Sequence, residues 1–300
     1  MPTYLQNNMG FSFRVLGHPG TFLLTVALAT AATLTTAGER LVATSGVTQV
    51  EGAAGGGLVP WAVIAGYGTR NEVGASAFVT RIETQGFKLD SMGVAIGIKD
   101  RLELSLARHR FNLGDTVPGQ SIDQNVVGIK LKLSGDAVFD QDKPWPQLSV
   151  GVQHKRNRDF DLAPKLLGAR HDIGTDYYLA ATKLYLAGLS GRNVLLNVTV
   201  RATKANQLGL LGFGGDLNDR YRLQGEASAA LLLTDSFSIG SEYRQKPNNL
   251  SAYRESDFWD VFAVWYVRKE ISITAAYAGL GNIANKPDQH GLYLSLQGAF

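Results

Sequence analysis

Apolar and polar side chains alternate along most of this chain, and this two-residue period restricts its fold more than any other feature. Side chains of a β-strand point to opposite faces in turn, so alternation predicts strands with one apolar face. In one segment, Leu102, Leu104 and Leu106 stand opposite Glu103 and Ser105. Clear alternation recurs in 59–68, 87–98, 101–112, 122–133, 148–153, 192–204, 222–233, 236–245 and 270–279, and less regular alternation in 44–50, 73–84, 173–187 and 257–268.

The final residues, 290–300, form a further alternating segment. Leu292, Leu294, Leu296 and Phe300 fall on one face, and the chain ends on that aromatic residue. In a soluble protein such a strand is an exposed edge open to aggregation, whereas in a closed barrel the last strand pairs with the first. A terminal Phe on an alternating strand resembles the C-terminal assembly signal of outer-membrane barrels, so we predict that Phe300 has this role.

The N-terminus predicts export. Arg14 precedes an apolar run at 21–34 that ends in small residues, as in a secretory signal peptide. We place cleavage after Ala37, with 29–31 as a rival site, and expect a signal peptide at 1–37 and a barrel at 38–300. A membrane anchor is the alternative, although the run is short for a span that needs about 20 apolar residues.

Composition excludes several classes of protein. There is no cysteine, which excludes disulfides, thiolate catalysis and cysteine-based metal sites. A net charge of +3 from dispersed residues gives no nucleic-acid footprint. The mean hydropathy of -0.04 is too polar for a helical membrane bundle.

Two features favour a membrane barrel over a soluble β-sandwich. Aromatic pairs, Trp61 with Tyr67 and Trp259 with Trp265, are six residues apart. That separation is about 20 Å along a strand, close to the height of an apolar band between two aromatic girdles. Connections also alternate between tight and long, as in barrels with short periplasmic turns and long outer loops, of which 281–289 is one. The exceptions are a long turn expected at 135–146 and a short outer loop expected at 84–87.

Strand number follows from parity, because both ends of the mature chain are expected on the periplasmic side. Using every segment gives about fourteen strands, which we favour because 59–68 has a clear apolar face. Treating 44–68 as a plug inside the barrel gives about twelve. The expected fold is therefore an all-β, single, antiparallel up-and-down transmembrane β-barrel.

Residues 47–69 and 101–111 resemble an exported Gram-negative outer-membrane β-barrel family known only as a domain of unknown function (DUF3034-like). The resemblance extends over the whole mature chain. It implies an outer-membrane location and no established activity, so it identifies no site residues.

Charged side chains on the polar faces are the main candidate functional residues. If the polar faces point inward, they line the lumen and either set the ion preference of a pore or pair with one another in a structural network. The lumen-lining candidates are Glu103, His109, Lys130, Lys132, Lys155, Arg201, Arg222, Glu226, Glu242 and Arg244. Their basic excess favours anionic solutes.

Glycine-rich segments and histidines offer weaker candidates. The segment 51–57 lacks the residues that a phosphate-binding loop requires and predicts a hairpin or a close backbone approach. The segments 207–216 and 162–168 are apolar for outer loops and could cover the mouth. His109 and Ser105 lie about 13 Å apart along one strand, too far for a catalytic pair. No metal-ligand spacing occurs among the histidines, and we expect no cofactor.

We therefore expect a passive pore or transporter for small, anionic or amphipathic solutes in the Gram-negative outer membrane, and not an enzyme. The alternatives are a non-conducting structural or adhesive barrel and a membrane-embedded lipid hydrolase. The expected partners are outer-membrane lipid, periplasmic chaperones, the barrel-assembly machinery and an unidentified solute.

Overall fold

The computed structural model describes Arg40, Thr44 and residues 46–300, which belong to one compact unit. The expected signal peptide, 1–37, lies outside the described residues. Within the described part, no helix is both long and apolar enough to span a bilayer.

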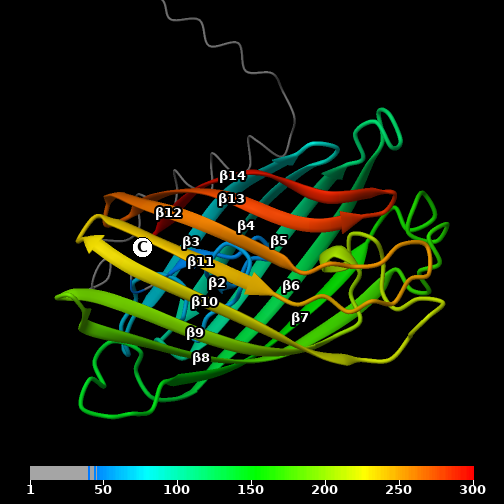
Figure 1. The fold of residues 1–300 in the computed structure, drawn as a ribbon. Helices are drawn as coiled ribbons and strands as arrows, with labels where there is room; N and C mark the ends of the chain where they lie inside the picture. The colour runs from blue at the N-terminus through cyan, green and yellow to red at the C-terminus, as the bar shows by residue number, and fades with distance from the viewer. Residues whose placement is uncertain (1–39, 41–43, 45) are drawn as a thin grey trace, which may run out of the picture. The chain divides into compact units, whose positions relative to one another are not determined.

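Twelve antiparallel strands form the wall (Figure 1). Each strand pairs with the next along the chain, and β14 pairs with β3, for example through Leu294 and Arg81, so the sheet closes without an edge. The strands are β3 (Val73–Thr84), β4 (Lys88–Ile98), β5 (Leu102–Asn112), β6 (Ser121–Ser134), β7 (Gln147–Asn157), β8 (Ile173–Leu189), β9 (Arg192–Thr203), β10 (Arg222–Thr234), β11 (Phe237–Arg244), β12 (Phe258–Arg268), β13 (Ile271–Ile283) and β14 (Lys286–Ala299).

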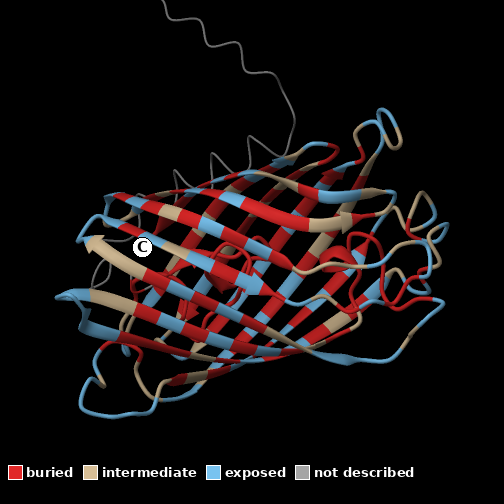
Figure 2. Cartoon of the chain, viewed as in Figure 1, coloured by how far each residue is buried: buried red, intermediate tan, exposed pale blue. Residues whose placement is uncertain are grey.

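Burial alternates along these strands (Figure 2), and many of the exposed positions carry apolar residues. On β5, Leu104 and Leu106 are 42% and 54% exposed, whereas Glu103 and Ser105 between them are 1% and 4% exposed. This arrangement is the reverse of a soluble protein and suits a wall that faces lipid. The closed sheet and its outward apolar face confirm the prediction of an all-β transmembrane barrel.

The favoured number of fourteen strands is wrong, and the twelve-strand alternative is correct. Residues 46–68, called the plug below, lie inside the barrel and are buried throughout. Their regular structure is limited to a short hairpin of β1 (Val47–Thr48) and β2 (Ala54–Gly55), with a bridge from Gly55 to Pro60. Pro60 cannot donate to a ladder, and the glycines before it let the chain fold back tightly.

The two aromatic pairs used to predict a lipid-facing wall lie in different parts of the structure. Trp259 and Trp265 lie exposed on the outer face of β12, as the prediction of aromatic girdles requires. Trp61 and Tyr67 belong to the buried plug, so their use as a lipid-facing pair is wrong.

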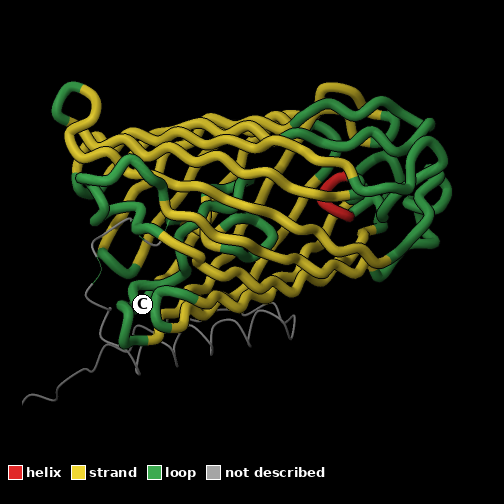
Figure 3. The backbone as a smooth tube through the Cα atoms, turned by 90° about the horizontal axis from the view of Figure 1, so that it is seen from below, coloured by secondary structure: helices red, strands yellow, loops and turns green. Residues whose placement is uncertain are grey.

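Connections differ between the two ends of the barrel (Figure 3). The turn end carries Phe300 and most of the tight hairpins, and the loop end carries the longer loops. The predicted long turn at 135–146 is confirmed, and so is the short outer loop predicted at 84–87, which the structure places at 85–87. The predicted long loop at 281–289 is wrong, because β13 and β14 continue past a bulge at Gly281 to a turn at 284–285.

Candidate functional site

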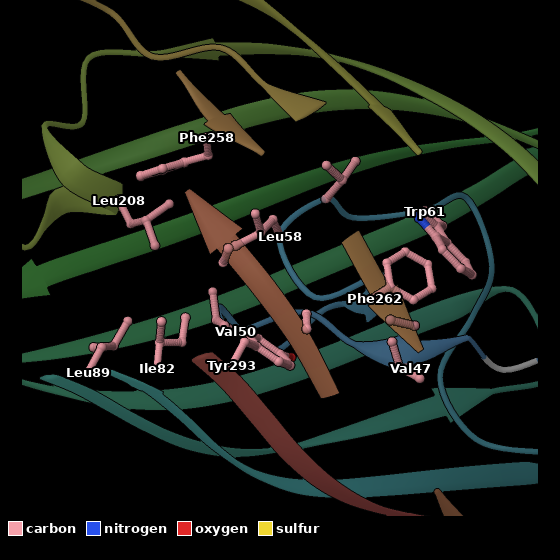
Figure 4. Packing of buried hydrophobic residues seen from close by; sticks show 14 of the residues in the cluster. Val47, Val50, Leu58, Trp61, Ile82, Leu89, Leu208, Phe258, Phe262 and Tyr293 are labelled. Carbon is pink, nitrogen blue, oxygen red and sulfur yellow. The ribbon is translucent and has the colours of Figure 1, made fainter. Parts of the chain in front are cut away.

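The plug occupies the lumen as an irregular chain whose apolar side chains pack against the inner wall. Val47, Val50, Leu58 and Trp61 belong to one buried cluster with wall residues that include Phe262 (Figure 4). An apolar cavity of about 40 Å³ remains beside Val47 and Trp61. This volume is far below the roughly 300–1,000 Å³ of ligand pockets, so the cavity does not provide a solute path.

Polar wall side chains hold the backbone of the plug. Ser149 and Gln147 on β7 donate to the carbonyl of Ala62 at 2.5 and 2.6 Å, and Thr199 on β9 donates to the carbonyl of Pro60 at 2.8 Å. These bonds satisfy backbone groups that an irregular buried segment cannot satisfy by itself.

Glu103 and Lys130 form a second anchor. Lys130 Nζ lies 3.1 Å from the Glu103 carboxylate and donates to the carbonyls of Ala54 and Val63, each at 2.9 Å. The Glu103 carboxylate accepts bonds from the backbone N–H groups of Ala54 and Ala65 at 3.2 and 2.9 Å. This wall pair therefore contacts the plug within its hairpin, at Ala54, and beyond it, at Val63 and Ala65.

Glu51 is the centre of a buried ion-pair network between plug and wall. Its carboxylate pairs with Lys155 on β7 and lies 2.7 Å from Arg244 on β11 and 4.0 Å from Arg201 on β9. The network, called the Glu51 cluster below, contains Glu51, Asp176, Glu226, Lys155, Arg201 and Arg244. Its three acidic and three basic groups balance, as buried charges require.

Glu242 forms a further contact on β11. Its carboxylate accepts bonds from the backbone N–H of Leu58 at 2.6 Å and from Ser228 at 2.7 Å. Gly56 permits this approach, because a Cβ at that position would lie 1.9 Å from a Glu242 oxygen. The predicted hairpin and close backbone approach at 51–57 are therefore both present.

The outer loop between β9 and β10 covers the mouth. Residues 206–215, called the cap below, are buried and include the 3₁₀ turn η1 (Gln207–Gly209). Asn157 donates to the carbonyl of Leu210 at 2.7 Å, and Gln124 donates to the carbonyl of Leu208 at 3.1 Å. Gln207 and Leu208 both have positive φ, a costly conformation that the surrounding contacts hold in place.

The second apolar loop, 162–168, also packs inward. Leu162, Ala163 and Leu167 are partly buried against the main cluster, and Leu167 N–H donates to Ala163 O in a single helical turn.

A buried ion pair in a neighbouring outer loop contacts the cap at Gln207. Lys246 and Glu255, in the loop between β11 and β12, lie 2.8 Å apart, and Gln207 of the cap donates to the same carboxylate at 2.8 Å. Burial raises the pKa of Glu255 above its usual value of 4.5 despite the neighbouring ammonium, and burial lowers the pKa of Lys246.

The structure places the predicted lumen-lining residues in three environments. Lys132 is partly buried at the turn end, 2.6 Å from Asp100, and Arg222 is exposed at the outer end of β10. The others are buried in the lumen, namely Glu103, His109, Lys130, Lys155, Arg201, Glu226, Glu242 and Arg244. Those eight contact the plug directly or belong to the Glu51 cluster.

Sequence reasoning missed Glu51 and Asp176. Glu51 lies in the glycine-rich segment, where no alternation assigns a face, and Asp176 lies in 173–187, whose two faces both carry apolar residues. A lone carboxylate within a glycine-rich segment was the available signal for Glu51.

In the described part of the chain, no histidine belongs to a cluster that could hold a metal ion. His109 Nε2 lies 2.8 Å from the carbonyl of Val50, so this ring contacts the plug. His154 is exposed on the outer wall beside Thr175, and His171 and His290 contact Asp219 and Gln85 at the loop end.

Comparison with solved structures gives similar barrels at low identity. The KdgM porin is 10% identical with a TM-score of 0.48, over 75% of this chain and 99% of that one. The NanC porin is 9% identical with a TM-score of 0.47, over 75% and 98%. The COG4313 outer membrane channel from Pseudomonas putida F1 is 13% identical with a TM-score of 0.43, over 79% and 96%.

No curated protein matches the chain significantly. One family does, under the description protein of unknown function (DUF3034), and its match covers residues 44–297. This range includes the plug and nearly all of the wall, so the chain belongs to the DUF3034 family.

Proposed function

We propose that this protein is an outer-membrane channel for small anionic solutes whose lumen is closed at rest by its own plug. The proposal depends on one observation: the plug is attached to the twelve-stranded wall by polar side chains. The Glu51 cluster and the Glu103–Lys130 pair make this attachment. The proposed setting is the outer membrane of a Gram-negative bacterium, reached by signal-peptide export, periplasmic chaperones and the barrel-assembly machinery.

The number of strands in the wall supports the proposal that the plug closes a lumen that is otherwise open. Eight strands enclose a space that wall side chains can fill by themselves, and twelve enclose more. Here the additional space holds residues 46–68, and the wall side chains around them include Glu103, Lys130, Lys155 and Arg201. Such a wall becomes wet once the plug moves, as conduction requires.

The preference for anions is supported by what surrounds Glu51. Within the Glu51 cluster, withdrawal of the plug leaves Lys155, Arg201 and Arg244 paired with Asp176 and Glu226 alone, which is one excess positive charge in that part of the lumen. The Glu51 carboxylate thus occupies a position where the carboxylate of a small solute would meet the same three cations. A solute that competes for them would favour plug release.

The experiment is conductance of the purified full-length protein in planar bilayers, for the native chain and for Glu51→Gln. Removing the Glu51 charge leaves the cluster with unbalanced cations, a cost of about 3 kcal/mol for a broken buried pair. We expect rare, brief openings of the native protein and about a hundredfold higher open probability in the variant. Open channels should pass chloride in preference to potassium.

Glu83→Gln is the matched control, because Glu83 pairs with Lys88 on the exposed outer wall, where an ion pair contributes little. A Glu51→Gln protein that never conducts would exclude the channel and favour the non-conducting structural barrel.

A further inference from the structure

The outward face of β5 and β7 changes from apolar residues to arginine toward the loop end. On β5, Leu102, Leu104 and Leu106 are followed in the same phase by Arg108 and Arg110. On β7, Leu148, Val150 and Val152 are followed by His154 and Arg156, and Arg158 comes directly after the strand. The arginine patch is defined as Arg108, Arg110, Arg156 and Arg158, all exposed.

Strand register brings these arginines together across β6. Asn125 on β6 pairs with Arg108 on one side and with Arg156 on the other. Asp123 pairs with Arg110, and its carbonyl accepts the backbone N–H of Arg158 at 2.8 Å. Because neighbouring strands are about 4.8 Å apart, the two pairs of arginines flank β6 at a separation of about 10 Å.

Carboxylates compensate the charge of the patch only in part, because Asp90 and Asp123 flank Arg110 in the strand register but bind Arg81 and Arg108. Arg108 pairs with Asp123 at 2.6 Å. Among the described residues, the side chains of Arg110, Arg156 and Arg158 have no ion-pair partner.

A surface hollow of about 450 Å³ lies beside the patch. It is lined by Arg156, Arg158 and Phe160, together with Asp161 and Asp172. The Asp161 carboxylate pairs with Lys165 at 2.7 Å, which leaves Asp172 as the carboxylate opposing the two arginines.

The position of the patch on the wall restricts what can occupy it. Arginine that faces hydrocarbon is unfavourable, and this cost falls toward the membrane interface. The patch continues directly from outward Leu106 and Val152, so it lies where the apolar surface of β5 and β7 ends. On β12 and β13, by contrast, the outward residues toward the loop end are Trp259 and Tyr277.

We infer that the arginine patch is a binding site for the phosphate groups of a lipid in the outer leaflet, the phosphorylated glycolipid lipid A. Arginine binds phosphate through two parallel N–H···O bonds, and the three arginines without an ion-pair partner, Arg110, Arg156 and Arg158, can hold two phosphates of one headgroup from the two sides of β6. The acyl chains would then lie against Leu104, Leu106 and Val152. A second copy of this chain fits the patch poorly, because a two-fold symmetric contact would place the positive patch of one copy against the positive patch of the other.

Native mass spectrometry of the full-length protein in detergent, titrated with lipid A, tests this inference. The patch variant is Arg110→Gln/Arg156→Gln/Arg158→Gln, which leaves the Arg108–Asp123 pair in place. The charge-matched control is Arg220→Gln/Arg222→Gln/Arg254→Gln, three exposed arginines at other positions of the loop end. Heat-modifiable migration in gels verifies that each variant keeps its barrel.

We expect lipid A to bind the patch variant about tenfold more weakly than the native protein and the control variant within about twofold of native, since each lost charge-assisted bond weakens binding. Enzymatically dephosphorylated lipid A should bind all three proteins equally weakly. Equal losses in both variants would reduce the effect to general surface charge and overturn the inference. Native-like binding by the patch variant would also overturn it, as would a change in oligomeric state without a change in lipid binding.

Discussion

The Glu51 carboxylate of the plug lies 2.7 Å from Arg244 Nη1 on β11, and 193 positions of sequence separate the two residues. Arg244 also lies 3.3 Å from Glu226 and donates to the carbonyl of Leu58 at 2.9 Å. One wall side chain thus contacts the plug at two points and connects it to the acidic residues of the wall.

A double-mutant cycle on Glu51 and Arg244 should give strong coupling. Glu51→Gln and Arg244→Gln each leave a buried partner without its charge, and the double variant restores the balance. We expect the two costs in the free energy of unfolding to be non-additive by about 2 kcal/mol, measured by denaturant titration in detergent. Additive effects would mean that the pair does not act as one interaction.

The Glu103–Lys130 anchor should be equally sensitive. Lys130→Met leaves the Glu103 carboxylate buried without its cation and removes the ammonium donor from the carbonyls of Ala54 and Val63. We expect a loss of about 3–5 kcal/mol in the free energy of unfolding. Lys143→Met, at an exposed turn, is the control, and an equal loss there would contradict the assigned role of Lys130.

The cap should loosen as pH rises above the usual carboxyl range. Burial destabilises the Glu255 carboxylate by more than the ion pair with Lys246 and the hydrogen bonds to it compensate, so the pKa of Glu255 is raised above 4.5. The protonated form therefore stabilises the cap, and this stabilisation is complete below pH 4.5 and is lost as pH rises through the raised value. We expect hydrogen-exchange protection factors for 206–215 to be lower at pH 7 than at pH 5, and Glu255→Gln to flatten this difference. Glu270→Gln, at a turn on the opposite end of the barrel, should leave it unchanged. Protection that increases with pH would contradict this account.

Phe300 should matter through both its backbone and its ring. Its carbonyl accepts bonds from Tyr67 N–H at 2.8 Å and Ala75 N–H at 2.9 Å, so the terminal residue joins the plug exit to β3. Deleting Phe300 removes these bonds together with the predicted assembly signal, whereas Phe300→Ala removes the aromatic ring alone. We expect reduced outer-membrane levels for both variants in cell fractionation, with the larger loss on deletion. Normal levels of the truncated protein would argue against the signal.

Alternation was sufficient to predict the wall, because a lipid-facing strand must be apolar on one face over its whole length. It placed Leu104 outside and Glu103 inside, as observed. It failed at 59–68, because a plug packed against a partly apolar inner wall also selects residues such as Val59 and Val63. Pro60 was the local signal against a central strand.

Of the residues in the candidate site, only those on the strands of the wall were predictable from the sequence. Lys155, Arg201 and Arg244 follow from strand phase, but their shared partner Glu51 depends on the fold of an irregular segment. No period describes such a segment, so its register against the wall arises from tertiary contacts. For the same reason, the burial of the cap could be stated from sequence only as one possibility.

The most direct test of the channel uses the absence of native cysteine. A Cβ at Gly52 of the plug would lie 3.3 Å from the Ala107 Cβ on β5, close to the separation in a disulfide. Gly52→Cys/Ala107→Cys, added to Glu51→Gln, should therefore attach the loosened plug to the wall, and the two single cysteine variants account for strain at Gly52, whose φ is +100°. In planar bilayers, we predict that the oxidised protein does not conduct and that a reducing agent restores openings within the same recording. Equal conductance before and after reduction would show that ions pass without movement of the plug and would contradict the proposed gate.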